Sequence, residues 1–394
     1  MIAVIMIDAL AKEYINHMSF LKKLASSNIF IETYLPLAGF EHRHYLLWGR
    51  YPDEIDKYTM YRKTKKSPFR MLVPFLPLLK KIENYPELNS KIKKYISKTV
   101  SFLNGYKINL NNIPYEFAPY FDMSGDRKPI EKLKIEEYDS IFDIFKKNKI
   151  SYKYLWYPYT KGTDTDKKRI QEFKSTIKEK KHDVVFLHLS NLDKYGHEYG
   201  LSKKTFFQVK KMDNVLEDIL SKKEVEKFIL FGDHGMVETK SSLDVMKKLS
   251  KLKKENKLND LVWFVDSTTL RLWYKKSQTK KKVGRFLKKL SSFGYLMDKK
   301  MRKKYHLEFN HDLFGVDIFV LKKKYVFVPS FFSNTKVKGM HGYLPEDNPS
   351  FLICSGKNKK ISTASEIDVL PTLLDLLSLY SDATDLPGQS LLKR

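Results

Sequence analysis

The chain has 394 residues, with 73 lysines and arginines against 46 aspartates and glutamates, which gives a formal net charge of +27. Hydrophobic residues make up 42% of the sequence, which excludes a wholly disordered chain, and the single cysteine, Cys354, excludes an intramolecular disulfide and a cysteine-rich zinc module. Any metal ion must therefore be bound by histidine and carboxylate side chains.

In chain order, three apolar segments predict buried parallel strands whose carboxyl ends carry polar groups. The segments and the polar residues that follow them are residues 2–7 with Asp8, residues 184–189 with Asp193, and residues 228–231 with Asp233 and His234. Between the last two segments, residues 203–221 carry apolar side chains at spacings of three and four, which predicts a helix packed on a sheet. Strand, helix and strand in this order imply a parallel sheet covered by helices, with its chemistry beyond the carboxyl ends of the strands.

Two segments interrupt this pattern, and we expect both to be insertions that cap the core. The first is basic and mostly helical in pattern, and the second combines strand-like segments with a lysine-rich helix. The predicted division is 1–60 (core), 61–130 (mostly helical insertion), 131–257 (core), 258–335 (small α+β insertion) and 336–394 (core). The predicted fold class is α/β, with a mostly parallel sheet flanked by helices.

The positive charge has two interpretations. It predicts either an anionic partner, such as a phosphate-bearing substrate, nucleic acid or anionic lipid, or a lysine-rich surface that contacts only solvent. Ten of the 73 cationic residues are arginines, and the other 63 are lysines. Because proteins that read nucleic acids rely on arginine for bidentate contacts, this composition argues against a nucleic-acid partner and favours the solvated surface.

The N-terminal residues do not resemble a targeting signal. They lack a basic start, and Asp8 ends the apolar run after a few residues. The longest apolar run, residues 71–79, contains two prolines and is too short to span a bilayer. We therefore expect a cytoplasmic protein, and peripheral contact with an anionic membrane stays open. The sequence does not indicate the oligomeric state.

Two short motifs place an aspartate and a histidine close together. Asp193 and His197 can face one metal ion if the chain coils back on itself, which Gly196 permits; the alternative is a turn with a surface histidine. Asp233 and His234 follow a predicted strand and are flanked by glycines. Adjacent residues in an extended chain point apart, so the glycines are needed for both side chains to converge on one ion.

Two further residues complete a candidate ligand set. His341 lies in a polar loop, where a histidine before a glycine often marks a turn, and Asp8 has a second interpretation as a helix N-cap. Together the six side chains suit two neighbouring divalent ions, with Zn²⁺ favoured and Mn²⁺ second. Two ions about 4 Å apart stabilise the attacking and leaving oxygens of an in-line phosphoryl displacement.

These motifs, taken together, resemble the alkaline phosphatase superfamily, and specifically its nucleotide pyrophosphatase/phosphodiesterase branch. The resemblance rests on residues 5–8, LDKYGHEYG at 192–200, FGDHGM at 231–236, MHGY at 340–343, and the closing segment 366–379 with Leu386-Pro387-Gly388. It implies an alkaline-phosphatase-like three-layer core with two divalent ions. Asp193, His197 and His341 would bind one ion, and Asp8, Asp233 and His234 would bind the other.

The sequence departs from the family pattern at the nucleophile. In the family a Thr or Ser opens a helix ten residues before a Gly-x-x-Pro segment and forms a covalent intermediate. Gly49 begins such a segment here, and counting back ten residues reaches Gly39. In that register Arg43 falls where related sulfatases carry an arginine, so we expect it to bind a substrate oxyanion; its alternative role is a surface ion pair.

Three explanations of the missing hydroxyl remain open. Water activated by a divalent ion could attack directly, Glu41 or His42 could serve as ligand or base, or the site could bind its substrate without turnover. Lys194 and Tyr195, beside a predicted ligand, are further candidates for substrate binding. We therefore expect a metal-dependent hydrolase of phosphodiester or pyrophosphate bonds in a nucleotide, nucleotide-sugar or lipid-linked substrate. The alternative is a protein of the same fold that binds a phosphorylated glycan or lipid and is catalytically impaired.

Overall fold

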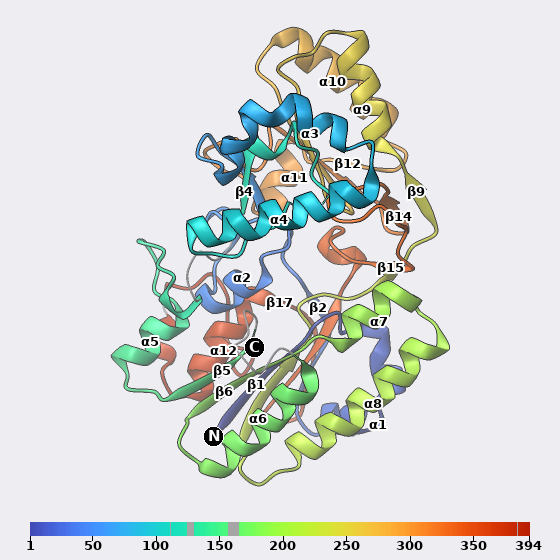
Figure 1. Ribbon diagram of the computed structural model, residues 1–394. Coiled ribbons are helices and arrows are strands. Elements are labelled where there is room, and N and C mark those ends of the chain that lie inside the picture. The colour runs from blue at the N-terminus through green and yellow to red at the C-terminus, as the bar shows by residue number, and fades with distance from the viewer. Residues whose placement is uncertain (111, 124–129, 157–164, 384) are drawn as a thin grey trace.

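The structure, a computed structural model, describes residues 1–110, 112–123, 130–156, 165–383 and 385–394. Its larger part is built around a seven-stranded sheet (Figure 1). Across the sheet the strands are β17 (Lys359–Ser365), β2 (Ile29–Leu35), β16 (Ser350–Cys354), β7 (Lys227–Phe231), β1 (Ile2–Ile7), β6 (Val184–Leu189) and β5 (Tyr152–Leu155).

The sheet is mostly parallel, as predicted. β1 lies between β6 and β7 and is parallel to both, with Ile2 opposite Val184 on one side and Lys227 on the other. β5 is parallel to β6, and β17 is parallel to β2, whereas β16 runs antiparallel to its neighbours β2 and β7. The carboxyl ends of β1, β6 and β7 therefore meet at the same edge of the sheet.

Helices cover both faces of this sheet. The even-numbered side chains of β1 join one hydrophobic cluster with α2, α5 and α12, and the odd-numbered side chains join another with α1, α6 and α8. This alternation of side chains along the strand produces three layers, which confirms the predicted core. The helices are α1 (Ser19–Ala25), α2 (His42–Trp48), α5 (Ile141–Lys147), α6 (Asp166–Glu179), α7 (Asn191–Tyr199), α8 (Lys203–Leu220) and α12 (Val369–Leu376). No helix among the described residues is long and apolar enough to cross a membrane.

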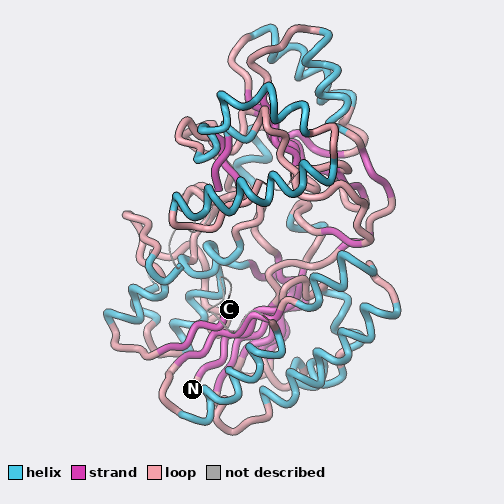
Figure 2. The backbone as a smooth tube through the Cα atoms, in the orientation of Figure 1, coloured by secondary structure: helices cyan, strands magenta, loops and turns pink. Residues whose placement is uncertain are grey.

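A second group of strands and helices forms a cap, which Figure 2 shows apart from the seven-stranded sheet. Its four-stranded antiparallel sheet has the order β10 (Val262–Val265), β11 (Thr269–Trp273), β13 (Asp317–Leu321) and β12 (Gly294–Leu296). Its helices are η2 (Pro68–Phe75, 3₁₀), α3 (Leu76–Ile82), α4 (Pro86–Asn104), α9 (Val245–Glu255), α10 (Ser277–Lys289) and α11 (Lys299–Lys304). Short paired strands complete it: β3 (Tyr61–Lys63) with β4 (Phe121–Met123), β9 (Ser241–Leu243) with β14 (Tyr325–Phe327), and β8 (Val237–Glu238) with β15 (Gly339–Met340).

The two predicted insertions share a hydrophobic cluster. Side chains from residues 61–121 and from residues 245–343 belong to the same buried cluster, so the two predicted insertions pack together. α9, which the sequence analysis assigned to a core segment, joins this cluster through Val245 and Leu249. The domain boundaries drawn from the sequence remain predictions.

Candidate metal centre

The six predicted ligands come from the carboxyl ends of three adjacent strands and from one loop. Asp8 directly follows β1, and Asp233 and His234 follow β7 after Gly232. Asp193 lies in the first turn of α7, which begins just after β6. Since β1, β6 and β7 are parallel neighbours, their ends bring these side chains together, and the loop after β15 supplies His341.

Asp193 and His197 share one face of α7, because residues four apart in a helix lie one turn above each other. The Asp193 Oδ1 atom lies 3.2 Å from His197 Nε2. The sequence analysis expected Gly196 to permit a tight backbone, but its role is close packing. A Cβ at Gly196 would lie 2.6 Å from the methyl carbon and 2.9 Å from the Cγ of Met236, so glycine lets α7 pack closely against the Met236 side chain.

The glycines around Asp233 and His234 also serve close approach. A Cβ at Gly232 would lie 2.3 Å from Ser350 Oγ, and one at Gly235 would lie 2.4 Å from the carbonyl oxygen of Pro349. The residues after β7 therefore lie directly against the segment that leads into β16. This contact fixes the position from which Asp233 and His234 enter the site.

The first candidate ligand group contains Asp8, Asp233 and His234, whose ligand atoms all lie within 4.8 Å of one another. His234 Nε2 lies 3.3 Å from Asp8 Oδ1 and 3.7 Å from Asp233 Oδ2. Asp233 Oδ1 accepts hydrogen bonds from the backbone N–H groups of Ala9 and His234, at 3.2 and 2.9 Å. One Asp233 oxygen is thus held by the backbone while the other faces His234.

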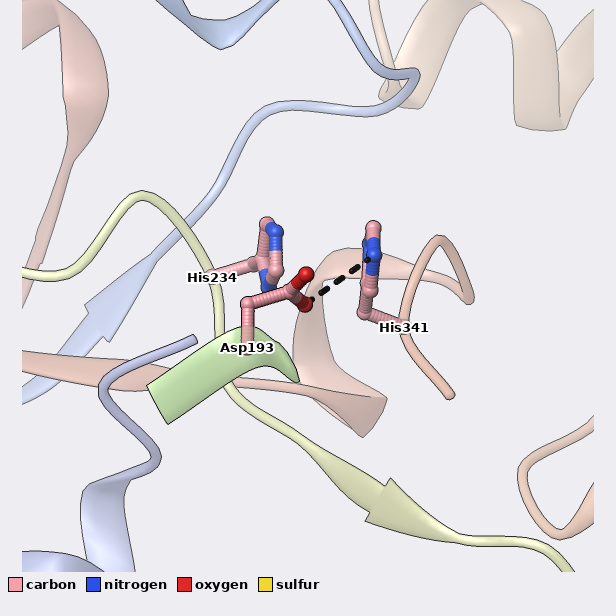
Figure 3. Close-up of side chains that lie close together, drawn as sticks. All are labelled: Asp193, His234 and His341. Carbon is pink, nitrogen blue, oxygen red and sulfur yellow. Dashed lines mark ion pairs between the residues drawn. The ribbon is translucent and has the colours of Figure 1, made fainter. Parts of the chain in front are cut away.

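The second group contains Asp193, His234 and His341, again with ligand atoms within 4.8 Å of one another. Figure 3 shows Asp193 and His341 with an ion pair between them, and Asp193 Oδ1 lies 3.6 Å from His341 Nε2. The rings of His234 and His341 stack with centroids 3.8 Å apart, and the His197 ring is 5.2 Å from that of His341. Because His234 belongs to both groups, the two candidate sites are immediate neighbours.

Backbone carbonyls orient two of the histidines. His197 Nδ1 lies 2.9 Å from the carbonyl oxygen of Gly339, and His234 Nδ1 lies 2.9 Å from that of Gly235. A carbonyl oxygen can only accept, so each Nδ1 carries a proton, and each Nε2 faces the aspartates. This is the outer contact that metal-binding histidines make.

The electrostatics of the cluster suit a cation. Burial, and then the negative charges of Asp233 and Asp193, raise the pKa of Asp8 well above its ordinary value. Burial, and then the charge of His234, lower the pKa of His341 far below its ordinary value. Burial acts to raise the pKa of Asp193, but the hydrogen bond from His197 and the charge of His341 outweigh it and lower that pKa. Converging carboxylates and imidazoles with nitrogen and oxygen donors fit divalent metal ions.

Gly39 is the residue that the sequence analysis aligned with the family nucleophile, and the backbone there excludes a side chain. Its φ angle is +112°, and a Cβ would lie 2.3 Å from the carbonyl oxygen of Tyr58 and 2.9 Å from the Tyr45 hydroxyl. The same Tyr58 carbonyl accepts a 2.8 Å hydrogen bond from the backbone N–H of Phe40. A threonine or serine therefore does not fit this conformation of the chain.

Glu41 and His42, two predicted catalytic residues, each have a buried partner. Glu41 Oε2 lies 2.9 Å from His44 Nδ1, and His42 Nδ1 lies 3.0 Å from the Glu366 carboxylate. The His42 ring centroid is 5.6 Å from that of His234, so His42 borders the first ligand group. Burial acts to lower the pKa of His42, but the charge of Glu366 and its hydrogen bond outweigh burial and raise it.

The three predicted substrate-binding residues lie around the cluster. Arg43 lies on α2, close enough for its charge to act on two residues of the site. Burial raises the pKa of Asp8 and the Arg43 charge opposes this, whereas burial lowers the pKa of His188 and the Arg43 charge adds to the lowering. Lys194 is exposed on α7, and the half-buried Tyr195 packs its ring 5.6 Å from that of Tyr199. Their roles in binding substrate remain predictions, as do the metal-binding roles of the six ligands.

The sequence analysis missed a buried ion pair that supports the site. Arg169 and Asp166, on α6, pair with each other and are 0% and 3% exposed. Asp166 accepts hydrogen bonds from the backbone N–H groups of Ser190 and Asn191, at 2.9 and 3.0 Å, and Arg169 Nε donates to the carbonyl oxygen of His188 at 2.6 Å. The pair therefore fixes the junction between β6 and α7.

Two other buried residues were also missed. His188, inside β6, has its Nε2 atom 3.6 Å from Asp8 Oδ2, and burial, followed by the charges of Arg169 and Arg43, lowers its pKa to about 3. Glu366 accepts a 2.6 Å hydrogen bond from the backbone N–H of Leu37 in addition to contacting His42. Within apolar segments these polar residues gave no local signal, since the strands and helices around them determine their neighbours.

Comparisons with known proteins agree with this geometry. Residues 126–243, which carry four of the six predicted ligands, match the model of the Metalloenzyme superfamily. This match supports binding of divalent metal ions, for which the two candidate ligand groups supply donors. No curated protein matches the chain.

Solved structures of ectonucleotide pyrophosphatase/phosphodiesterase 5 match almost the whole chain. The human protein aligns with a TM-score of 0.68 and 12% identity, covering 99% of this chain and 96% of that one. The murine protein aligns with a TM-score of 0.67 and 14% identity, covering 99% and 97%. An inactive variant of the murine protein in complex with AMP gives a TM-score of 0.67 and 14% identity, covering 99% and 96%.

At these identities the likeness shows the fold. The chain has the architecture of a nucleotide pyrophosphatase/phosphodiesterase, and the resemblance to the alkaline phosphatase superfamily predicted from its motifs is confirmed.

Proposed function

We propose that the chain is a metal-dependent hydrolase of phosphodiester or pyrophosphate bonds that uses two divalent ions, Zn²⁺ first and Mn²⁺ second. The observation that carries the proposal is the convergence of three aspartates and three histidines at the carboxyl edge of a parallel sheet. Nitrogen and carboxylate donors without thiolates suit both metals.

The chain offers two adjacent ligand groups for these ions. Asp8, Asp233 and His234 would hold one ion, and Asp193, His341 and His197 the other, with His234 lying between the groups. When bound, a pair of ions supplies positive charge to the attacking and leaving oxygens of an in-line phosphoryl displacement. The backbone contacts of the histidines and of Asp233 hold the donors in place before any ion binds.

The nucleophile in this proposal is water. Gly39 has no hydroxyl, and Glu41 and His42 are engaged by His44 and Glu366. Arg43, whose charge reaches Asp8, would bind a phosphoryl oxygen, because guanidinium groups match phosphate geometry.

A nucleotide is the substrate class that the comparisons favour, since one of the similar structures contains AMP. Nucleotide-sugar and lipid-linked phosphates carry the same phosphoryl chemistry and are the next candidates. The reaction would take place in the cytoplasm, as the sequence analysis expects.

The second candidate function is binding of a phosphorylated glycan or lipid without turnover. The specific observation in its favour is Gly39, whose backbone conformation excludes the family nucleophile. Both functions share the six ligands, and they differ only in whether a bond is broken.

The test combines metal analysis with turnover by the full chain. The purified protein is assayed for bound metal by mass spectrometry, and then for hydrolysis of bis-p-nitrophenyl phosphate and of a dinucleotide pyrophosphate with added Zn²⁺ or Mn²⁺. Asp8→Asn is compared with Asp213→Asn, a matched control because Asp213 is a buried aspartate that caps α1 through the N–H groups of Phe20 and Leu21.

We expect metal binding and turnover in the wild type and in Asp213→Asn, and loss of both in Asp8→Asn. Bound metal with AMP affinity but no turnover would select the binding function. A protein that neither retains metal nor hydrolyses any of these esters with either ion refutes both.

A further inference from the structure

Exposed apolar side chains concentrate in one part of the cap. Eleven of the sixteen large hydrophobic residues that are exposed in the described chain lie between residues 60 and 120. Scattered exposed hydrophobic residues need no explanation, but a concentration in a short segment marks an interaction surface. The eleven are Met60, Met71, Val73, Phe75, Leu78, Tyr85, Leu88, Tyr95, Phe102, Leu103 and Tyr120.

The arrangement is clearest on α4, the long helix at the front of the cap in Figure 1. Leu88, Tyr95 and Phe102 follow one another at intervals of seven residues, so they form a single row along the helix. Their exposed fractions are 48%, 73% and 86%. Other residues of α4, including Val100, are buried against the cap, so the helix has an inner apolar face and a separate outer apolar row, which we call the α4 ridge.

Lysines flank the α4 ridge. Lys91, Lys94 and Lys98 are exposed on the same helix. Lys91 and Lys98 lie three or four residues from members of the ridge, and Lys94 lies one turn from each of these two lysines. Residues 61–110 contain twelve lysines and arginines against two glutamates, so the whole region is strongly positive. Long lysine stems lie along apolar surface while their ammonium groups extend outward.

A groove runs along the lysine side of the same helix. Its volume is about 960 Å³, and its lining includes Lys93, Lys94, Lys98 and Lys107 together with Ser90 and Asn109. Hydroxyl, amide and ammonium donors in one groove are suited to phosphate oxygens. Lys94 and Lys98 line the groove and also lie beside the α4 ridge, so the two features form one continuous surface. A second exposed apolar segment, η2 with α3, packs beside α4.

We propose that the α4 ridge and its lysines dock the cap on an anionic lipid membrane. Leu88, Tyr95 and Phe102 enter the boundary between headgroups and acyl chains, while the lysines and the groove contact the lipid phosphates. An uncovered apolar row beside a row of cationic side chains is the pattern of a helix that lies in a membrane interface. Charge complementarity selects an anionic bilayer, since the cationic rim makes little contact with a neutral one. The proposal does not depend on the metal centre or on the proposed hydrolase activity.

The test uses the purified full chain and vesicles of two compositions. One set contains phosphatidylcholine alone, and the other contains equal parts of phosphatidylcholine and phosphatidylglycerol. The wild type is expected to sediment with the anionic vesicles, to bind more weakly as salt is raised, and to stay in solution with the neutral ones.

Two triple variants separate the apolar and the charged contributions. The ridge variant replaces Leu88, Tyr95 and Phe102 with serine, and the charge variant is Lys91→Gln with Lys94→Gln and Lys98→Gln. Losing three lysines near an anionic surface should weaken binding on the order of a hundredfold. The ridge variant should weaken it at least tenfold, because the apolar contact is lost.

The matched controls change the same residue types elsewhere. Phe207→Ser removes an exposed ring on α8, and the triple Lys281→Gln, Lys288→Gln and Lys289→Gln removes exposed charges from α10. Both should bind within twofold of the wild type, and all four proteins should keep the wild-type circular dichroism spectrum.

Three results would overturn the proposal. The first is equal binding to neutral and anionic vesicles, or binding to neither. The second is a loss in the α10 control as large as that in the charge variant. The third is a wild-type dimer in solution that the ridge variant converts to a monomer, which would assign the surface to contact between two copies of the chain.

Discussion

Restoring the family nucleophile by Gly39→Thr should destabilise the chain and should not create a faster enzyme. The new Cβ would lie 2.3 Å from the Tyr58 carbonyl oxygen and 2.8 Å from the Tyr58 ring, and the backbone there has a φ of +112°. A non-glycine residue held in such a conformation costs roughly 1–3 kcal/mol. Moving the Tyr58 carbonyl also weakens its hydrogen bond from the Phe40 N–H, which contributes about 1 kcal/mol.

The expected loss in the free energy of unfolding is therefore about 2–4 kcal/mol. It is measured by urea or guanidinium denaturation of the full chain at neutral pH. Gly105→Thr is the matched control, because Gly105 also has a positive φ, of +70°, but nothing lies within 4 Å of the position of its Cβ. The control retains the positive φ without the collision. The difference between the two variants in free energy of unfolding therefore measures the cost of the collision with Tyr58.

The same variant tests the chemistry. Hydrolysis of bis-p-nitrophenyl phosphate by Gly39→Thr should be no faster than by the wild type, and no phosphothreonine should form when the variant is quenched during turnover. A stable Gly39→Thr protein that gains activity and forms a covalent phosphorylated intermediate would refute the reasoning. It would mean that the backbone of residues 39–40 adapts readily and that the family mechanism is available to this chain.

Other parts of the structure give further predictions. Chelation should lower the midpoint of thermal unfolding of the wild type, and Asp8→Asn should abolish this shift, because the converging carboxylates repel one another without a cation; an equal shift in the variant would contradict the assignment. Arg169→Leu should cost about 3–5 kcal/mol of stability by leaving Asp166 buried without its partner, and a cost below 1 kcal/mol in denaturant titrations would exclude that role. Burial acts to raise the pKa of Asp260, but hydrogen bonds from Thr279 and backbone N–H groups lower it to about 2. Its stabilising contribution is therefore complete above about pH 4, the unfolded value, and is lost as the pH falls toward 2, so Asp260→Asn should flatten the acid end of the stability profile.

The sequence predicts the centre of the fold well because the relevant signals are local. β1, β6 and β7 are continuous apolar segments, and each is followed closely by a polar residue that the parallel arrangement carries to the shared edge. The three strands and α8 could therefore be drawn from periodicity alone. The three-layer arrangement was predicted because a strand, a helix and a second strand follow one another along the chain.

The elements that were not predicted lack such a local signal. The adjacent polar residues Glu32 and Thr33 interrupt the apolar run of β2, and β12 and β13 are short strands in a lysine-rich region. The many charged residues of α6 predict a solvent-exposed helix. In the structure α6 packs against β6, and this packing buries Asp166 and Arg169. Burial of a charged pair depends on tertiary neighbours, so spacing along the chain does not reveal it.

The segment around Gly39 differs from the family pattern in more than the loss of one hydroxyl, because the residues around it form new polar contacts. Two buried histidine–carboxylate pairs, His44 with Glu41 and His42 with Glu366, occupy the start of α2. Burying charged groups is costly unless each is paired, so this arrangement requires all four side chains together. The pairs bring polar groups beside the first ligand group, where a covalent mechanism would need a hydroxyl. In the proposed hydrolase water is the nucleophile, and the rate should respond to loss of Glu366, which positions His42, while metal content stays unchanged.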